Sequence, residues 1–325
     1  RIKIMKKAFI TGINGQDGSY LAEHLLHDGY EVAGLIRRCS VAENQTYRIN
    51  HICNDIRTYY GDLTDPISIE RALEDFNPDK VFNLAAQSHV RLSFKMPAFT
   101  ASVNAIGALN LFEAVKSICP DAKVYQASSS EMFGSSVDED KYQRETTPMH
   151  PVSPYGCSKL FAYSAARNYR KAYSLFISNG ILFNHESPRR GTNFVTAKVI
   201  QGALQIKKGL TENLELGNLD SYRDWGHSYD YTKAMIKLLD LNEPEDIVIS
   251  TGKTNSVRDL CKYTFDKLGL DYKDHVKINP AFLRPQELPF LCGDSSKAKK
   301  ILNWNPEYDF EKLISEMITE FEKKF

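Results

Sequence analysis

Tyr155 and Lys159 have the spacing that a proton-transfer pair needs. On a helix, residues four apart share one face, so the lysine ammonium is expected one turn from the phenol. A nearby positive charge favours phenolate and lowers the pKa of a tyrosine. The pair is therefore predicted to take a proton from a hydroxyl group while a hydride leaves the carbon that bears this hydroxyl. Such a pair also arises by chance on helix surfaces, so the motifs around it decide whether it indicates a catalytic role.

A serine-rich segment with one carboxylate precedes this pair. Residues 127–134 read ASSSEMFG, and hydroxyls such as that of Ser129 can bond substrate hydroxyls. Glu131 is the informative residue, because a simple epimerase or reductase needs no carboxylate here. An elimination does need one, to take an acidified C–H proton and to assist the departing water. Standing alone, Glu131 would be interpreted as a surface glutamate on a loop.

A glycine pattern near the N-terminus is suited to holding a nucleotide. Gly12, Gly15 and Gly18 form a GxxGxxG motif. Such glycines allow a tight turn and a close approach of backbone to a pyrophosphate, which the N-terminus of the following helix attracts. The motif lies between a strand predicted at 7–11 and a helix predicted at 17–27. This context favours a dinucleotide site over a mere turn.

The residues directly after the strand predicted at 31–36 bear on the choice of dinucleotide. An NAD enzyme usually carries an acidic residue there for the ribose 2′-hydroxyl. This sequence has Arg37 and Arg38 instead. Planar guanidinium groups suit a 2′-phosphate, so NADP is expected, although a solvated basic turn has the same appearance.

Further cofactor contacts are expected where the next strands end, because open α/β sheets bind ligands at their carboxyl edge. Asp62 and Leu63 follow a strand predicted at 58–60 and are placed to reach the adenine ring. The nicotinamide ribose is expected along the residues that end and follow a strand predicted at 80–85, namely Leu84, Ala85, Ala86, Gln87 and Ser88.

Strands and helices alternate through the first half of the chain. Helices at 67–76 and 97–118 and a strand at 123–127 complete the pattern, which predicts an α/β fold with a Rossmann-type doubly wound parallel sheet. Beyond residue 185 the pattern loosens. The elements expected there are helices near 193–207, 229–241, 256–268, 295–302 and 310–325 and short strands near 214–216 and 247–250.

Two lobes are expected from this change of pattern. Residues 1–185 are expected to form mainly an NADP-binding Rossmann domain, and residues 186–325 mainly a smaller C-terminal α/β substrate lobe. No proline- or glycine-rich linker separates them. The lobes are therefore expected to pack directly on one another and to exchange some chain.

The composition excludes several classes of protein. The 41 basic and 41 acidic residues give a formal net charge of zero, and no basic patch stands out, so no nucleic-acid partner is expected. No run of about 18 apolar residues stands out, so no membrane span is expected. The six cysteines are scattered without zinc spacing. We expect reduced thiols, no metal and a cytoplasmic location.

Longer strings carry a family resemblance. The chain resembles the GDP-mannose 4,6-dehydratases of the extended short-chain dehydrogenase/reductase family, nearly end to end. The NHESPRR and RDWG strings are more specific than the Rossmann motifs. The matching stretches are 11–20 (TGINGQDGSY), 83–90 (NLAAQSHV), 125–134 (YQASSSEMFG), 153–160, 180–190 (GILFNHESPRR), 216–226 (LGNLDSYRDWG) and 284–293.

The resemblance implies catalytic roles for four residues. Tyr155 and Lys159 match the family's base pair for oxidation at C4, and Glu131 matches its C5 base. Ser129 stands where the family usually has threonine, so the hydroxyl is kept and a methyl group is lost.

The resemblance also implies two binding sets. The cofactor-binding set is Gly12, Asn14, Gly15, Gln16, Asp17, Arg37, Arg38, Asp62, Leu63, Leu84, Ala85, Ala86, Gln87, Ser88, Phe99, Tyr155, Lys159, His185 and Arg190. The substrate-binding set is Ser88, Asn184, Val195, Lys198, Leu216, Asn218, Arg223, Arg284 and Glu287. Arginine and lysine in the second set suit a diphosphate, and its carboxylate suits ribose hydroxyls or a purine edge.

The reaction implied is an internal redox dehydration of a GDP-sugar. C4 is oxidised, water leaves across C5 and C6, and the hydride returns to C6, giving GDP-4-keto-6-deoxymannose from GDP-mannose. NADP is expected to stay tightly bound and to be regenerated in each turnover. The family assembles as homo-oligomers, and a short segment at 40–57 leaves a homodimer or a homotetramer open.

Other functions remain open at this point. A GDP-heptose 4,6-dehydratase needs only a slightly wider pocket. A nucleotide-sugar reductase or epimerase of the same fold is a further alternative, and Glu131 counts against it. A catalytically silent dinucleotide sensor belongs to a different class, but it has no need for Tyr155, Lys159 and Glu131 together.

Overall fold

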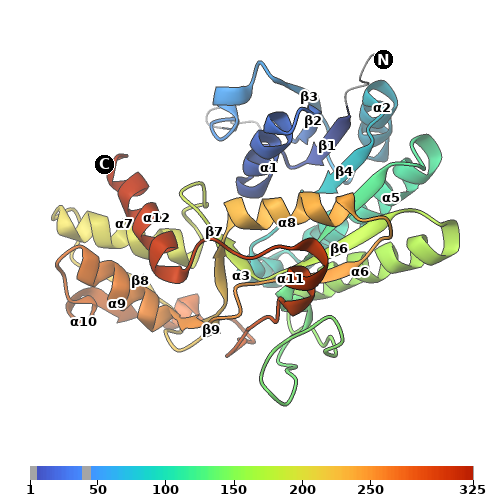
Figure 1. The fold of residues 1–325 in the computed structure, drawn as a ribbon. Coiled ribbons are helices and arrows are strands. Elements are labelled where there is room, and N and C mark those ends of the chain that lie inside the picture. The colour runs from blue at the N-terminus through green and yellow to red at the C-terminus, as the bar shows by residue number, and fades with distance from the viewer. Residues whose placement is uncertain (1–5, 39–44, 325) are drawn as a thin grey trace.

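The computed structural model describes residues 6–38 and 45–324. Its centre is a seven-stranded parallel sheet in the order β11-β6-β5-β4-β1-β2-β3 (Figure 1). The order reverses beside β1, which makes the crevice at the carboxyl ends of β1 and β4 the expected ligand position. This confirms the predicted doubly wound parallel sheet. The strands are β1 (Lys7–Thr11), β2 (Glu31–Ile36), β3 (Ile56–Tyr60), β4 (Lys80–Asn83), β5 (Lys123–Ser129), β6 (Ile177–Leu182) and β11 (Asp246–Ile249).

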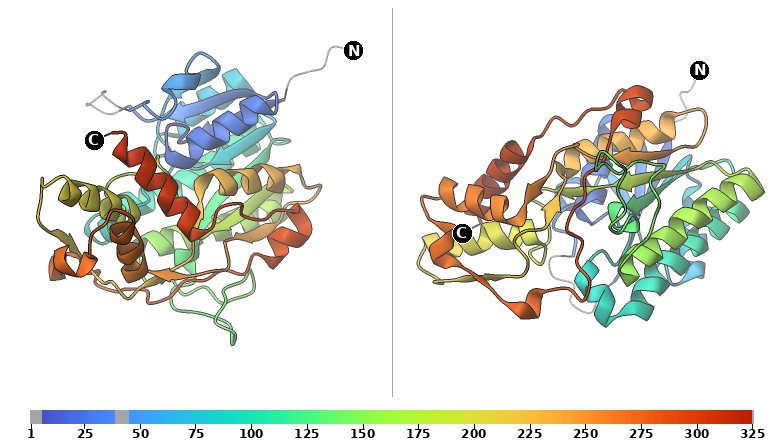
Figure 2. Two further views of the ribbon diagram at one scale, coloured as in Figure 1. Left: turned by 60° about the vertical axis from the view of Figure 1, so that its left-hand side comes forward. Right: turned by 90° about the horizontal axis from the view of Figure 1, so that it is seen from below.

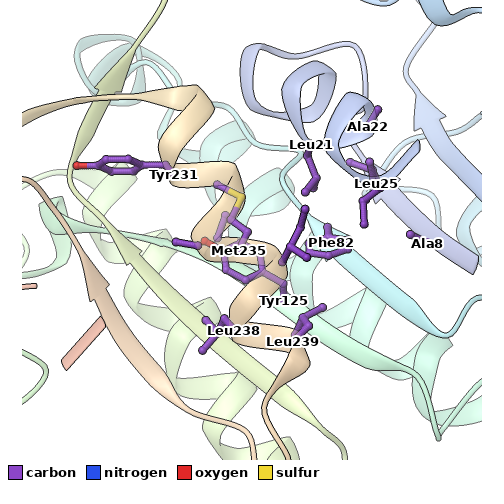
Figure 3. Close-up of a cluster of buried hydrophobic side chains, with 14 of the residues drawn as sticks. Ala8, Leu21, Ala22, Leu25, Phe82, Tyr125, Tyr231, Met235, Leu238 and Leu239 are labelled. Carbon is purple, nitrogen blue, oxygen red and sulfur yellow. The ribbon is translucent and has the colours of Figure 1, made fainter. Parts of the chain in front are cut away.

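Helices cover both faces of this sheet. One face carries α1 (Gln16–His27), α8 (Ser228–Asp240) and α11 (Ser296–Leu302), and the other carries α2 (Pro66–Phe76), α5 (Gly107–Ile118) and α6 (Pro154–Tyr173). Figure 3 shows side chains of α1 and α8 meeting around Phe82 of β4. Every residue of β4 is buried, with Val81 in the core on one face of the sheet and Phe82 in the core on the other. Burying a side chain such as Phe82 contributes about 1.5–3 kcal/mol.

The second lobe has a core of its own. Apolar faces of α7 (Val195–Lys207), α9 (Val257–Lys267) and α12 (Phe310–Glu322) pack together there. Strand β8 (Leu214–Leu216) pairs with β13 (Val276–Ile278) at its edge, next to α10 (Tyr272–His275). Two further short pairs are β7 (Asn184–Glu186) with β10 (Trp225–His227), and β9 (Tyr222–Arg223) with β12 (Asn255–Ser256).

Chain from beyond residue 185 also builds the first lobe. Strand β11 pairs with β6, α8 packs on α1, and α11 adds Ala298 and Leu302 to the same core. These contacts are compatible with an exchange of chain between lobes. Both that exchange and the division of the chain into domains near residue 185 stay predictions.

Strand β6 escaped the sequence analysis. Its residues, ISNGIL, include polar groups in the middle of a buried strand. Ser178 and Asn179 are fully buried, and Asn179 donates to Asp246 at 2.8 Å while it accepts from Ser128 at 3.2 Å. Tertiary hydrogen bonds therefore replace the apolar pattern by which a buried strand is normally recognised.

The helix predicted at 97–118 is continuous but not uniform. It consists of α4 (Pro97–Ala101), a π-helical turn η2 (Ser102–Ile106) and α5. By length and composition alone this stretch could cross a membrane, although serine, asparagine, glutamate and lysine interrupt it, so it is not a run of 18 apolar residues. In the fold 56 % of its apolar window is buried, because it packs against α2 and α6.

A long loop leaves the sheet between β5 and α6. Figure 2 shows it projecting from the body of the molecule. Arg144 fixes this loop, since its guanidinium reaches Asp138 at 2.9 Å, Asp140 at 2.6 Å and Asp294 at 2.7 Å. Behind the loop, η3 (Ser130–Met132) turns the chain at the end of β5.

Candidate active site

A cavity of about 560 Å³ opens at the carboxyl ends of the parallel strands, between the two lobes. Its walls come from the loops after β4 and β5, from α6 and β7, and from the second lobe. All four predicted catalytic residues line it, as do all the predicted substrate residues: Ser88, Asn184, Val195, Lys198, Leu216, Asn218, Arg223, Arg284 and Glu287. The fold therefore gathers both sets in one place.

The predicted cofactor residues divide into two groups. Those that line the cavity are Asp17, Leu84, Ala86, Ser88, Tyr155, Lys159, His185 and Arg190. The others lie outside its lining: Gly12, Asn14, Gly15 and Gln16 in the glycine turn, Arg37 and Arg38 after β2, Asp62 and Leu63 after β3, Ala85 and Gln87 after β4, and Phe99 on α4.

The glycine turn has no room for side chains. Gly12 has a φ of +73°, and a Cβ atom there would lie 3.0 Å from the backbone nitrogen of Ala85. A Cβ atom on Gly18 would lie 2.2 Å from the carbonyl oxygen of Gly12. Gly15, the N-cap of α1, supplies no side-chain hydrogen bond to the helix. The start of α1 is therefore a bare, positively polarised cradle that fits a dinucleotide pyrophosphate.

Arg37 and Arg38 are exposed directly after β2. Within the described residues neither guanidinium makes an ion pair, and that of Arg38 lies 5.8 Å from the ring of Tyr60. Two unpaired cations at this strand end fit a 2′-phosphate.

Two predicted cofactor residues have scaffold roles in this structure. Gln87 is buried, and its amide donates to Thr100 at 3.0 Å, while its backbone nitrogen donates to Asn104 at 2.8 Å. Leu63 is buried under the glycine of residue 107, where a Cβ atom would come within 2.6 Å of it. These contacts fix the loop after β4 and the start of α5.

The predicted catalytic side chains are all buried, with at most 9 % exposed. Ser129 ends β5, and its Oγ accepts from the backbone nitrogen of Glu131 at 3.2 Å. Tyr155 and Lys159 lie on the first turns of α6, which Ser153 caps through the backbone nitrogen of Gly156. The predicted sharing of one helix face is therefore present, with Lys159 Nζ 5.9 Å from the Tyr155 ring centroid.

Electrostatics at this pair differ from the sequence-based prediction. Burial raises the pKa of Tyr155 to about 12, against a lowering effect from a hydrogen bond with Ser129. Burial lowers the pKa of Lys159 to about 8. The lysine ammonium donates to the carbonyl oxygen of Ala127 at 2.9 Å. The prediction that Lys159 brings the pKa of Tyr155 below its ordinary value was wrong for this structure, because desolvation dominates.

A chain of four charges crosses the cavity. Arg284 lies 3.5 Å from Glu131 and 3.4 Å from Glu287, and Glu287 lies 3.1 Å from Arg223. Arg223 is 6 % exposed and donates to the carbonyl oxygen of Leu288 at 2.8 Å. The fold thus joins the predicted C5 base to the predicted substrate arginines.

Part of the cavity lining is basic and aromatic. Lys198 Nζ lies 3.7 Å from the centroid of the Phe282 ring and donates to the carbonyl oxygen of Glu215 at 2.7 Å. Arg91 lies 5.1 Å from the same ring. Arg190 is held by Glu186 at 3.0 Å and stacks 3.5 Å from the centroid of the Phe194 ring. Cations grouped around rings in this way suit an anionic ligand.

Several site residues were missed by the sequence analysis. Arg91 lines the cavity and was not singled out, although it adjoins the NLAAQSHV string. Glu186 is buried and orients Arg190; its place inside NHESPRR was the available signal. Asn104, which supports the loop after β4 from outside the cavity lining, has no such signal. Its amide donates to the carbonyl oxygen of Gln87 at 3.0 Å and to Ser158 at 3.1 Å, and it is presented by the π-helical turn.

Two further features bear on the chemistry. Across residues 6–38 and 45–324, no group of three or more His, Cys, Asp or Glu side chains is arranged to hold a metal ion. The described cysteines are free thiols: Cys53, Cys119, Cys157, Cys261 and Cys292.

The chain is similar to known proteins along most of its length. The family model for GDP-mannose 4,6 dehydratase matches residues 9–317. GDP-mannose 4,6 dehydratase 1 of Arabidopsis thaliana is 50 % identical, over 98 % of this chain and 90 % of the relative. GDP-mannose 4,6 dehydratase of Homo sapiens is 45 % identical, over 96 % of this chain and 90 % of the relative. Among solved structures, the UDP-glucose 4-epimerase of Thermus thermophilus in complex with NAD has a TM-score of 0.85 and 26 % identity, covering 98 % of this chain and 100 % of that one.

Proposed function

The chain belongs to the GDP-mannose 4,6-dehydratase family, and on that premise we propose that it converts GDP-mannose to GDP-4-keto-6-deoxymannose and water. The observation that carries the proposal is buried Glu131 in one cavity with Tyr155 and Lys159. A tyrosine–lysine pair alone suits any hydride transfer next to a hydroxyl. A second buried carboxylate beside it suits an elimination, which has to remove a proton from carbon.

NADP is the proposed cofactor, and the enzyme is an NADP-dependent hydro-lyase. The bare start of α1 fits the pyrophosphate, and Arg37 and Arg38 fit the 2′-phosphate. Bound there, NADP supplies the acceptor for the C4 hydride and the donor that returns it to C6, so none is consumed.

Tyr155 and Lys159 serve the oxidation of C4. Tyr155 takes the O4 proton as the hydride departs. Lys159, anchored on the carbonyl oxygen of Ala127 at 2.9 Å, supplies the positive charge that stabilises the phenolate. Because burial raises the pKa of Tyr155 to about 12, this nearby charge is needed to make phenolate accessible.

Glu131 and Ser129 serve the loss of water. The 4-keto group acidifies the C5 hydrogen, and Glu131 removes it as a proton. Glu131 then gives this proton to the C6 hydroxyl, which leaves as water. The Ser129 hydroxyl, 3.2 Å from the backbone nitrogen of Glu131, bonds O4 or the departing group. The atoms balance: the C6 hydroxyl and the C5 proton form water, the C4 hydride moves to C6, and the O4 proton replaces the one lost from C5.

Basic side chains of the second lobe bind the GDP part of the substrate. Arg223, Arg284 and Lys198 surround the same cavity and suit the diphosphate. Glu287 pairs with both arginines, and its carboxylate is proposed to bind ribose hydroxyls or the guanine edge.

Mass spectrometry of the nucleotide sugar tests the proposal. Incubation with GDP-mannose is expected to lower the mass of the sugar nucleotide by about 18 units without net use of cofactor. Water loss from GDP-heptose but not from GDP-mannose would keep the mechanism and change the substrate. No loss from either would refute the dehydratase function and favour a reductase or a silent nucleotide-binding protein.

The active unit is proposed to be a homo-oligomer in the cytoplasm. Apolar side chains are exposed on adjacent helices: Phe99 on α4, Ile106 on η2 and Phe161 on α6. A second copy of this chain would cover them and the apolar 97–118 stretch. Light scattering of the protein and of Phe161→Glu tests this: a wild-type dimer or tetramer and a variant monomer are expected, and a wild-type monomer would contradict it.

A further inference from the structure

Asp17 lies where three elements of the two lobes meet. It is on the first turn of α1, directly after the glycine turn. Its Oδ2 lies 2.8 Å from Nε2 of His185 on β7, and its Oδ1 accepts from the hydroxyl of Ser228 on α8 at 2.6 Å. Gln16 Nε2 adds a third hydrogen bond to Oδ1 at 3.1 Å. The carboxylate thus joins the nucleotide-binding turn to β7 and α8.

The contacts of His185 fix how many protons it carries. Nδ1 lies 2.7 Å from the carbonyl oxygen of Phe183, and Nε2 lies 2.8 Å from Asp17. Both neighbours are acceptors, whereas a neutral imidazole has only one N–H group to donate. A neutral histidine beside an ionised aspartate has one proton too few for these two contacts. The His185–Asp17 pair must therefore hold one additional proton. Oδ1 accepts from Ser228 and Gln16 wherever that proton lies. Because a carboxylic acid is ordinarily a much stronger acid than an imidazolium, the proton belongs to His185 and Asp17 is a carboxylate.

His227, another buried histidine of this chain, provides a contrast. Its Nδ1 accepts from the backbone nitrogen of Tyr229 at 2.9 Å, so that nitrogen carries no proton. Its Nε2 lies 3.1 Å from Glu316. That contact lacks hydrogen-bond geometry, so in the described structure only Nδ1 of His227 has a hydrogen-bond partner. Burial is therefore common to both histidines, and only the partners of His185 demand a second proton.

Electrostatics agree with this proton count. Burial opposes the charged form of His185, but the charge and hydrogen bond of Asp17 and the Phe183 carbonyl raise its pKa. Burial likewise opposes the charged form of Asp17, but His185, Ser228 and Arg190 lower its pKa. The titratable and charged groups that face the pair from other segments are Arg190 after β7, Lys159 and Tyr155 on α6, Tyr125 on β5 and Tyr231 on α8.

We infer that Asp17 keeps His185 doubly protonated and that this charged pair positions β7 for the reaction. Strand β7 carries Asn184 and Glu186, and Glu186 holds Arg190, so the pair sets a wall of the cavity against the nucleotide-binding turn. Asp17 and His185 are positioning residues in this account, whereas the sequence analysis placed both among the cofactor contacts. The positioning role rests on the proposed function; the protonation of His185 does not.

Asp17→Asn separates charge from geometry. An asparagine can turn its amide N–H₂ to His185 Nε2 and keep its oxygen for Ser228 and Gln16, so each hydrogen bond has a counterpart. His185 then needs only the N–H at Nδ1 and becomes neutral. Ser228→Ala is the matched control, because it removes one hydrogen bond from Asp17 and leaves the carboxylate.

The first measurement is nitrogen NMR of histidine-labelled holoenzyme at about pH 7.5. Both ring nitrogens of His185 are expected in the protonated range in the wild type and in Ser228→Ala. In Asp17→Asn, Nε2 is expected in the unprotonated range. An unprotonated ring nitrogen of His185 in the wild type would overturn the inference, whether or not the variants fold.

The second measurement is the rate of water loss from GDP-mannose. Asp17→Asn is expected to lower kcat roughly 10- to 100-fold through misplacement of β7, with a melting temperature close to that of the wild type. Unchanged kcat and KM in a variant with neutral His185 would overturn the positioning role. If the wild-type protein releases no water from GDP-mannose while His185 is doubly protonated, the proposed function is wrong and the inference about the charged pair is kept.

Discussion

Glu131→Gln tests the assignment that separates an elimination from a plain oxidation. The change removes a charge and keeps the volume of the side chain. The backbone nitrogen of residue 131 still donates to Ser129, and Arg284 keeps Glu287 at 3.4 Å as its other partner. The substitution is therefore expected to leave the cavity in place and to remove only the base.

The expected loss is set by the role of a general base. Such a group contributes about 10²- to 10⁴-fold to a rate, or about 3–5 kcal/mol of activation free energy. Glu131 is 8 % exposed, so bulk water has little access to replace it. Water loss from GDP-mannose should fall at least about 100-fold. The glycine turn is not touched, so cofactor binding should be unchanged.

Two assays read the two halves of the reaction. Mass spectrometry measures water loss from the sugar nucleotide, and absorbance at about 340 nm measures the reduced dinucleotide that C4 oxidation forms. Glu131→Gln should accumulate the reduced form on adding GDP-mannose. The control Glu287→Gln, which changes the next carboxylate along the same charge chain, should raise KM and still release water. Water loss within about threefold of the wild type in Glu131→Gln would refute the assignment.

Three other predictions concern the cofactor, the lysine and a buried carboxylate. Replacing Arg37 and Arg38 together with alanine should raise the Kd for NADP far more than the Kd for NAD in binding assays; equal effects would contradict a 2′-phosphate site. Burial lowers the pKa of Lys159 to about 8, so its ammonium loses a proton as the pH rises through about 8 and kcat should fall there. A kcat that stays constant to higher pH would argue against this role of Lys159. Asp224 accepts four hydrogen bonds, from Thr251 N and Oγ1 and from the backbone nitrogens of residues 252 and 293. Asp224→Asn leaves at least one N–H without an acceptor and should cost about 1–3 kcal/mol in urea unfolding, against a small effect of Asp220→Asn at an exposed ion pair; equal stability of the two variants would contradict this.

Local patterns in the sequence were sufficient for much of the first lobe. Strands β1 and β2 begin and end where they were predicted, because buried parallel strands are apolar runs bounded by turn residues. The glycine turn and the Tyr155–Lys159 pair are also local, since a few consecutive residues set their geometry. The family resemblance added the substrate residues, whose individual positions carry no local signal.

Only the tertiary structure decided how these parts act together. Strand β6 was missed because Ser178 and Asn179 are satisfied by partners distant in sequence. The pKa of Tyr155 was predicted in the wrong direction because burial, which outweighs the lowering effects of Ser129 and Arg190, depends on the whole fold. The contact of Arg284 with Glu131 and the proton held by His185 likewise depend on groups that folding brings together from distant segments. A sequence pattern reports the geometry of neighbouring residues, whereas desolvation and charge pairing depend on what the folded chain places around them.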